Sequence, residues 1–144
     1  MSYTYNNPHP AVTVDCVVIT KNREVLLVKR KYEPEKDCWA FPGGFMNIDE
    51  TAETACLREL AEETGLHLDE ADIYQIGAYT AVERDPRERV ITIAYLAEVP
   101  HSFDVKGADD AAQAQWFPLD EHPQLAFDHA EILSDALLIL EGDE

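Results

Sequence analysis

The sequence predicts an α/β (α+β) protein built on a mixed β-sheet. Segments rich in β-branched residues outnumber segments with helical periodicity, and the two kinds do not alternate as they do in a doubly wound fold. A length of 144 residues, with 46% hydrophobic side chains, suits one compact domain. We therefore expect a single domain over residues 11–144, preceded by a loose, polar N-terminal arm over residues 1–10.

The expected strands share a high content of β-branched or aromatic residues and are bounded by polar turns. They are residues 11–20, 24–30, 73–82, 90–99 and 113–119. The first two are separated by three polar residues, which predicts a hairpin. A further segment, residues 39–45, contains Pro42-Gly43-Gly44, which breaks regular structure.

Two segments have helical periodicity. Apolar residues recur every fourth position in residues 50–64, and a similar apolar stripe runs along residues 127–140. Asp49 or Thr51 is the expected N-cap of the first helix. Gly65 stands where a left-handed C-cap is expected, so this helix is predicted to end at residue 64.

Charge and composition argue against several classes of protein. The chain has 29 Asp and Glu against 11 Lys and Arg, a formal net charge of -18, which disfavours nucleic acids and anionic membranes as partners because both are polyanions. No apolar run approaches the roughly 20 residues that span a bilayer, and the polar start lacks the pattern of a secretory signal. The 3 cysteines are widely spaced, which favours neither a disulfide framework nor a CxxC metal site and indicates a reduced, cytoplasmic setting.

Three carboxylates gather toward the end of the first expected helix. Glu59 precedes Glu63 by four residues and Glu62 by three, so all three project to one side. Like charges at this spacing weaken a helix, and the helix dipole disfavours anions at its C-terminal end. Two interpretations stay open: a solvated face of an acidic protein, or an oxygen-ligand site for Mg²⁺ or Mn²⁺. The nearby turn at Gly43 and Gly44 favours the second, because its backbone can approach a ligand closely.

The spacing from Gly44 to Leu66 resembles that of one family. Gly44 is followed after five residues by Glu50 and after seven more by the run RELAEETGL, which begins at Arg58. The segment is similar to the Nudix box, G-x5-E-x7-R-E-U-x-E-E-x-G-U with U apolar, at every specified position. The run WAFPGG from Trp39 and the strand pattern extend the resemblance over most of the chain. The resemblance implies the Nudix α/β/α sandwich, with a mixed sheet between helices and the box as a loop-helix-loop.

The same resemblance implies a role for each residue of the box. The metal ligands would be three carboxylates and one backbone carbonyl, from Glu59, Glu62, Glu63 and Gly43. Glu50 and Arg58 would form an ion pair that fixes the loop against the helix. Family members mostly hydrolyse a nucleoside diphosphate linked to another moiety, which implies a metal-dependent pyrophosphohydrolase. The general base stays open among Glu59, Glu83 and Asp110.

Two later stretches, residues 79–95 and 108–129, resemble the ADP-ribose pyrophosphatase branch of the family. This implies ADP-ribose as the substrate, with AMP and ribose 5-phosphate as products. The residues expected to contact substrate are Arg30, Arg84, Arg87, Asp110, Phe127 and His129. Simpler interpretations stay open for most of them: solvated cations for the arginines, a turn carboxylate for Asp110 and core packing for Phe127. Trp39 and Tyr79 are expected in the core or the pocket wall.

Two other functions stay open. One is a nucleotide-pool sanitiser that acts on nucleoside triphosphates. The other is a non-catalytic ADP-ribose sensor, although such sensors usually carry a DNA-binding domain, for which this length leaves no room beyond the sandwich. The complete set of box acids favours catalysis. The expected partner is a small nucleotide, without nucleic acid or membrane, and a homodimer through the C-terminal helix or the arm is compatible with the sequence.

Overall fold

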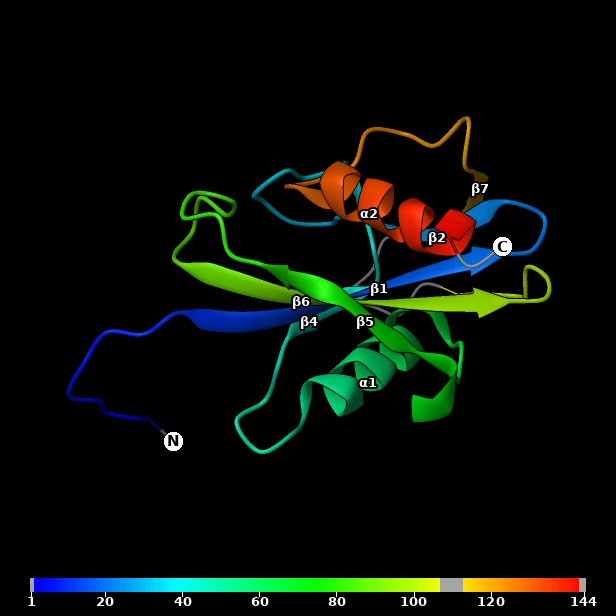
Figure 1. Ribbon diagram of the computed structural model, residues 1–144. Helices are drawn as coiled ribbons and strands as arrows, with labels where there is room; N and C mark the ends of the chain where they lie inside the picture. Colours follow the sequence, from blue (N-terminus) through cyan, green and yellow to red (C-terminus); the bar gives the residue numbers. More distant parts are fainter. Residues whose placement is uncertain (1, 107–112, 143–144) are drawn as a thin grey trace.

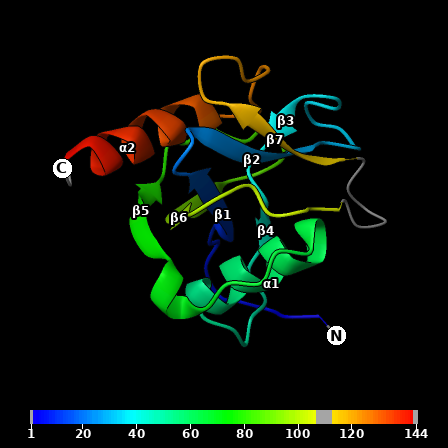
Figure 2. The ribbon, with the colours of Figure 1, turned by 90° about the vertical axis from the view of Figure 1, so that its right-hand side faces the viewer.

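A seven-stranded mixed sheet forms the centre of the computed structural model, which describes residues 2–106 and 113–142. Helix α1 (Ala52–Thr64) covers one face of the sheet and helix α2 (His129–Gly142) covers the other (Figure 1). The view turned by 90° in Figure 2 shows the same three layers. The expected α/β/α sandwich with a mixed sheet is thus confirmed.

All the expected strands are present. The strands are β1 (Ala11–Thr20), β2 (Glu24–Lys29), β3 (Trp39–Ala40), β4 (Gly43–Phe45), β5 (Tyr74–Tyr79), β6 (Val90–Val99) and β7 (Ala114–Pro118). The two short strands β3 and β4, on either side of Pro42, were not expected, and β5 ends three residues earlier than expected. A short 3₁₀ turn, η1 (Glu70–Asp72), precedes β5. The main order is β3-β2-β1-β6-β5, while β4 pairs with β1 and β7 pairs with β2. The sheet is mixed because β1 and β6 are parallel and the other pairs are antiparallel.

Strand β1 lies at the centre, and its side chains alternate between two cores. Val14, Cys16 and Val18 pack on the side of α1, whereas Val17 and Ile19 pack on the side of α2. This alternation follows from the two-residue period of a strand. It also explains why β1 reads as a nearly continuous apolar run, since both of its faces are buried.

The ends of the helices follow local backbone chemistry. The side-chain oxygen of Thr51, and not that of Asp49, accepts the N–H of Thr54 at 3.1 Å and caps α1. Gly65 ends the helix with a φ of 77°, as expected. Helix α2 begins at His129, two residues later than expected, because Phe127 has a φ of 51° and lies outside the helical region.

The cysteines, the helices and the N-terminal arm have the following features. The three cysteines, Cys16, Cys38 and Cys56, are all free. Within the two described ranges, no helix is long and apolar enough to cross a membrane. Residues 2–9 of the arm are exposed and extend away from the sandwich (Figure 1).

Candidate active site

An ion pair joins the loop after β4 to helix α1. Arg58 donates to Glu50 twice, from Nη2 to Oε1 at 2.6 Å and from Nε to Oε2 at 3.0 Å. The hydrogen bond from Arg58, together with that from the Asn47 N–H, lowers the pKa of Glu50, and the same pairing raises the pKa of Arg58. The predicted ion pair is therefore confirmed, and its bidentate geometry fixes the loop against the helix.

The same arginine also organises the acidic face of α1. Nη1 of Arg58 donates to Glu59 Oε1 at 2.8 Å and to Glu62 Oε2 at 3.3 Å. Glu62 is the most exposed of these carboxylates, with 59% of its side chain accessible, compared with 15% for Glu59. One guanidinium thus contacts three acidic residues, and this offsets the like-charge repulsion that the sequence predicts along this helix.

Glu63 is the most perturbed carboxylate of the site. Burial, and then the neighbouring carboxylate of Glu59, raise the pKa of Glu63 to about 9. The N–H of Gly43 donates to its Oε2 at 3.4 Å and partly opposes this shift. Burial also raises the pKa of Glu59, against the effect of Arg58. Two adjacent, partly desolvated carboxylates therefore face the glycine turn.

The two glycines of the turn lie very close to neighbouring atoms. A Cβ on Gly44 would lie 2.8 Å from the carboxylate carbon of Glu59. A Cβ on Gly43 would lie 2.1 Å from the carbonyl oxygen of Val14 in strand β1. The turn thus lies tightly between β1 and the acidic face of α1. Only glycine fits at position 43, where backbone blocks a Cβ, whereas at position 44 the obstacle is the end of the flexible Glu59 side chain.

The chemistry of this group fits a hard divalent cation. Its donors are carboxylate and backbone oxygens, the ligands that Mg²⁺ and Mn²⁺ prefer. A buried carboxylate with a raised pKa, such as Glu63, gains most when a cation stabilises its charged form. Among the side chains that the structure describes, no three His, Cys, Asp or Glu residues surround a common point, and Arg58 holds both Glu59 and Glu62.

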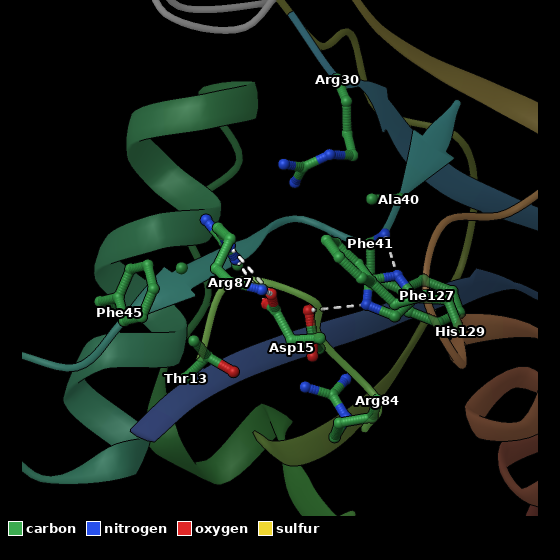
Figure 3. A pocket seen from close by; sticks show the side chains of 13 residues that line it. Thr13, Asp15, Arg30, Ala40, Phe41, Phe45, Arg84, Arg87, Phe127 and His129 are labelled. Carbon is green, nitrogen blue, oxygen red and sulfur yellow. Dashed lines mark hydrogen bonds and ion pairs between the residues drawn. The ribbon is translucent and has the colours of Figure 1, made fainter. Parts of the chain in front are cut away.

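A pocket of about 210 Å³ adjoins the glycine turn and brings together most of the residues expected to contact substrate (Figure 3). Five of the six predicted residues line it: Arg30, Arg84, Arg87, Phe127 and His129. The sixth, Asp110, lies outside the described residues. Gly43 and Gly44 line the same pocket, so the Nudix-like segment and the predicted substrate residues form one site.

Two of the pocket arginines stack on aromatic rings. The guanidinium carbon of Arg30 lies 4.8 Å from the ring centre of Phe127, and that of Arg87 lies 5.3 Å from the ring centre of Phe45. Arg30 also donates from Nε to the carbonyl of Pro34 at 2.8 Å. Phe127 is thus half-buried in the pocket wall and packs against a cation, and plain core packing does not describe its position.

The other arginine, Arg84, is held in a buried ion pair. It donates to both carboxylate oxygens of Asp128, at 2.9 and 2.6 Å, and its side chain is 4% exposed. This burial contradicts the interpretation of Arg84 as a solvated cation. Arg87 pairs in the same bidentate way with Asp85, at 3.0 and 2.6 Å, but keeps 38% of its side chain exposed. Arg87 is therefore the more accessible of the two to an anionic ligand.

A series of polar contacts between buried residues links β1 to His129 beside the pocket, and the sequence did not predict it. Asp15 accepts a hydrogen bond from the Thr92 hydroxyl at 2.6 Å, and its other oxygen lies 3.4 Å from Nε2 of His129. His129 Nδ1 accepts the backbone N–H of Phe41 at 3.2 Å. Burial lowers the pKa of His129, and the neutral ring can accept this bond. A charged residue in the middle of an apolar strand was the available signal for Asp15.

Three further predicted residues have clear positions. Trp39 packs edge-on against Phe117 with ring centres 4.8 Å apart, and Tyr79 donates from its hydroxyl to Asp135 at 2.7 Å. Both side chains pack against the core on the side of α2, as expected. Glu83 is exposed in the loop between β5 and β6 and is not part of the pocket lining.

An acidic helix that faces a glycine turn, beside a pocket lined by arginines, defines an enzyme class that hydrolyses phosphoanhydride bonds with the help of a divalent cation. The chain belongs to the Nudix family, since the family model of the NUDIX domain matches residues 9–136. The match covers nearly all of the described sandwich.

Similar proteins place the chain within this family. It is 45% identical over 127 residues to an ADP-ribose pyrophosphatase of Methanocaldococcus jannaschii, a match that covers 88% of this chain and 73% of that protein. The structure superposes on the NUDIX domain of Shewanella oneidensis NrtR complexed with ADP ribose, with a TM-score of 0.85 and 30% identity over 93% of this chain and 90% of that one.

A third similar structure contains a metal. It is a bifunctional NMN adenylyltransferase/ADP ribose pyrophosphatase from Francisella tularensis, complexed with AMP and a Mn ion, with a TM-score of 0.80 and 32% identity. The match covers 95% of this chain but 43% of that protein, so the chain spans less than half of that relative.

Proposed function

We propose that this protein is an Mg²⁺-dependent pyrophosphohydrolase that cleaves ADP-ribose to AMP and ribose 5-phosphate. The observation that carries the proposal is the pocket in which the glycine turn of the Nudix box meets Arg30, Arg87 and Phe127. This arrangement offers cations for a diphosphate and an aromatic wall for a base or ribose. The similarity to proteins named for ADP-ribose hydrolysis or complexed with ADP ribose supports the same substrate.

The acidic face of α1 would hold the divalent cation. Its ligands would be carboxylates of Glu59, Glu62 and Glu63 and the carbonyl of Gly43. When bound, the cation neutralises phosphate charge and lowers the pKa of a bound water. Mg²⁺ is the proposed ion because it shares its coordination shell readily with phosphate oxygens. The Mn ion in a similar structure supports a divalent cation.

The charge of the site explains why a cation is needed. A carboxylate about 4 Å from a phosphate oxygen costs on the order of 4 kcal/mol at an effective dielectric constant of 20. In their charged forms, Glu59 and Glu63 would therefore repel a diphosphate unless a cation lies between them and the phosphates. Arg58 offsets part of this negative charge, but its guanidinium is also paired with the carboxylate of Glu50.

The pocket arginines would bind and orient the substrate. Arg87 presents a partly exposed guanidinium, whose fork matches two phosphate oxygens. Arg84 would act indirectly, because its ion pair with Asp128 holds the loop that carries Arg87 against the start of α2. As general base we propose Glu59, which adjoins the glycine turn, with Glu83 and Asp110 as the alternatives.

A product assay tests the proposal. Purified protein is incubated with Mg²⁺ and, separately, ADP-ribose, NADH, diadenosine polyphosphates and nucleoside triphosphates, and the products are resolved chromatographically. We expect ADP-ribose to turn over fastest and to give AMP and ribose 5-phosphate. Faster release of pyrophosphate from a triphosphate would instead identify a nucleotide-pool sanitiser. Binding of ADP-ribose without cleavage would identify a sensor.

Two further proposals concern the setting of the enzyme. The three free cysteines suit a reduced cytoplasm, where we place the activity. We propose a homodimer through α2 or the arm, because Leu138, Tyr3 and Tyr5 expose 65%, 55% and 52% of their surfaces. Analytical ultracentrifugation checks the dimer, and a monomer at assay concentrations would contradict it.

A further inference from the structure

The turn between β3 and β4 is held by hydrogen bonds from three directions. The N–H of Phe41 donates to His129 Nδ1 at 3.2 Å, and the N–H of Gly43 donates to Glu63 at 3.4 Å. Pro42 has no N–H, and its carbonyl accepts the N–H of Cys16 at 2.8 Å. Helix α2, helix α1 and strand β1 therefore each contribute one bond to the segment from Phe41 to Gly43.

The bond from α2 depends on one ring whose orientation is fixed on both sides. Because Nδ1 of His129 accepts the Phe41 N–H, the ring proton lies on Nε2, which faces Asp15 Oδ1 at 3.4 Å. The ring also stacks on the Phe41 side chain, with centres 4.9 Å apart and planes 18° apart. Figure 3 shows His129 beside Phe41, linked to Asp15 by a dashed line.

Asp15 is in turn fixed by its own partners. The hydroxyl of Thr92 in β6 donates to its second oxygen at 2.6 Å, and both residues are buried. Asp15 also lies opposite Gly43 in the β1–β4 ladder. The series of contacts Thr92–Asp15–His129–Phe41 thus runs from the neighbouring strand β6 to the turn that precedes the proposed carbonyl ligand.

We infer that His129 is a positioning residue for the metal site, which acts through its hydrogen bond to the Phe41 N–H and thereby sets the place of Gly43. It does not need to touch the substrate, although it lines the pocket. The inference rests on the proposed function only for the location of the cation. A partner that orients a metal-binding group typically contributes 10- to 100-fold to metal affinity.

Two substitutions separate the two contacts of the ring. His129→Asn places an amide oxygen near the position of Nδ1 and keeps an acceptor for Phe41, while it loses the reach to Asp15. His129→Gln places its amide near the position of Nε2, so it keeps a contact with Asp15 and loses the one with Phe41. The readout is Mn²⁺ affinity of the full chain, measured by electron paramagnetic resonance without substrate. The result is therefore independent of whether ADP-ribose is the substrate.

We expect His129→Gln to weaken Mn²⁺ binding about tenfold and His129→Asn to stay within about threefold of the parent. Tyr79→Phe is the control, because it removes the bond to Asp135 on the same helix but far from the turn. It should lower the melting temperature and leave Mn²⁺ affinity unchanged. Equal Mn²⁺ affinity in all variants, or equal losses in both His129 variants, would overturn the inference.

A substitution of Thr92, at the other end of this series of contacts, covers the case in which neither His129 variant folds. Thr92→Val removes the hydroxyl that fixes Asp15 and keeps nearly the same side-chain shape. Its Mn²⁺ affinity should stay within about threefold of the parent, as for His129→Asn, because the bond from the Phe41 N–H to His129 remains. A loss of about tenfold in folded Thr92→Val would show that Asp15, and not the Phe41 bond, controls the metal site and would reject the inference.

Discussion

Replacing Gly44 by alanine should impair the site while leaving the fold nearly intact. The new Cβ would lie 2.8 Å from the Glu59 carboxylate, whereas ordinary van der Waals contact begins near 3.4 Å, so the carboxylate must move by about 0.6 Å. The atoms that must move belong to the end of a flexible side chain, and the cost is that of an off-rotamer glutamate, about 1 kcal/mol. The loss of chain flexibility on replacing glycine offsets a similar amount, so the free energy of unfolding should change by less than about 1 kcal/mol.

The catalytic effect of Gly44→Ala should be much larger. A misplacement of about 1 Å in a catalytic group costs up to 100-fold in rate, so a shift of about 0.6 Å predicts a loss in kcat of roughly 15-fold, or about 1.6 kcal/mol. Initial rates of ADP-ribose hydrolysis at saturating Mg²⁺ measure this loss, and thermal unfolding measures the stability of the same sample.

Gly43→Ala is the matched control for the neighbouring glycine. Its Cβ would lie 2.1 Å from the backbone carbonyl of Val14, which cannot move without disturbing strand β1. Its cost should therefore appear in stability, at about 3 kcal/mol or more. The reasoning fails if Gly44→Ala retains parental kcat, or if it destabilises the protein as much as Gly43→Ala.

Three other predictions follow from the same site. Glu59→Gln and Glu63→Gln should each lower turnover by roughly two orders of magnitude or more with folding intact, because each removes a charge that the cation needs; near-parental rates would reject the metal assignment. Arg84→Ala and Arg87→Ala should each lower the free energy of unfolding by about 3 kcal/mol, because they leave Asp128 and Asp85 unpaired, with side chains 17% and 3% exposed; Arg87→Ala should in addition raise KM for ADP-ribose roughly tenfold, and equal KM values in the two variants would contradict this division. Arg87 holds the pKa of Asp85 below its usual value, so the stability that Asp85 contributes is present above about pH 4 and is lost as pH falls through its lowered pKa. The difference in melting temperature between the parent and Asp85→Asn should therefore shrink on acidification, and a constant difference from neutral to acid pH would contradict it.

Local chemistry made most of the fold predictable. β-Branched composition predicted the strands, and Gly65 correctly marked the end of α1. The start of α2 was predicted two residues early, because the apolar stripe continues through Phe127 while its backbone does not. The N–H of Phe127 is bound instead by the Glu35 carboxylate, a contact between distant parts of the chain that no local pattern encodes.

In the candidate site, too, features set by local sequence were predictable, and features set by long-range contacts were not. Fixed spacing on one helix predicted that the box carboxylates share a face, because helical geometry sets those distances. The Glu50–Arg58 pair, which joins a loop to the helix, was expected from the family resemblance. The different surroundings of Arg84 and Arg87 were not predictable, since one loop carries both and burial alone separates them. The role of Asp15 depends on the pairing of β1 with β6 and on the packing of α2, and both are long-range contacts.

The parallel pairing of β1 with β6 has a consequence for how the chain folds. Ala11 pairs with Val90 and Thr20 with Val99, so the longest ladder of the sheet joins segments from opposite halves of the chain. The β1–β2 hairpin closes a short loop and can form early, but it leaves one edge of an apolar strand open. During synthesis this edge of β1 stays unpaired until β6 has left the ribosome. Because an unpaired apolar strand edge can pair with another chain, β1 is exposed to aggregation in the nascent protein.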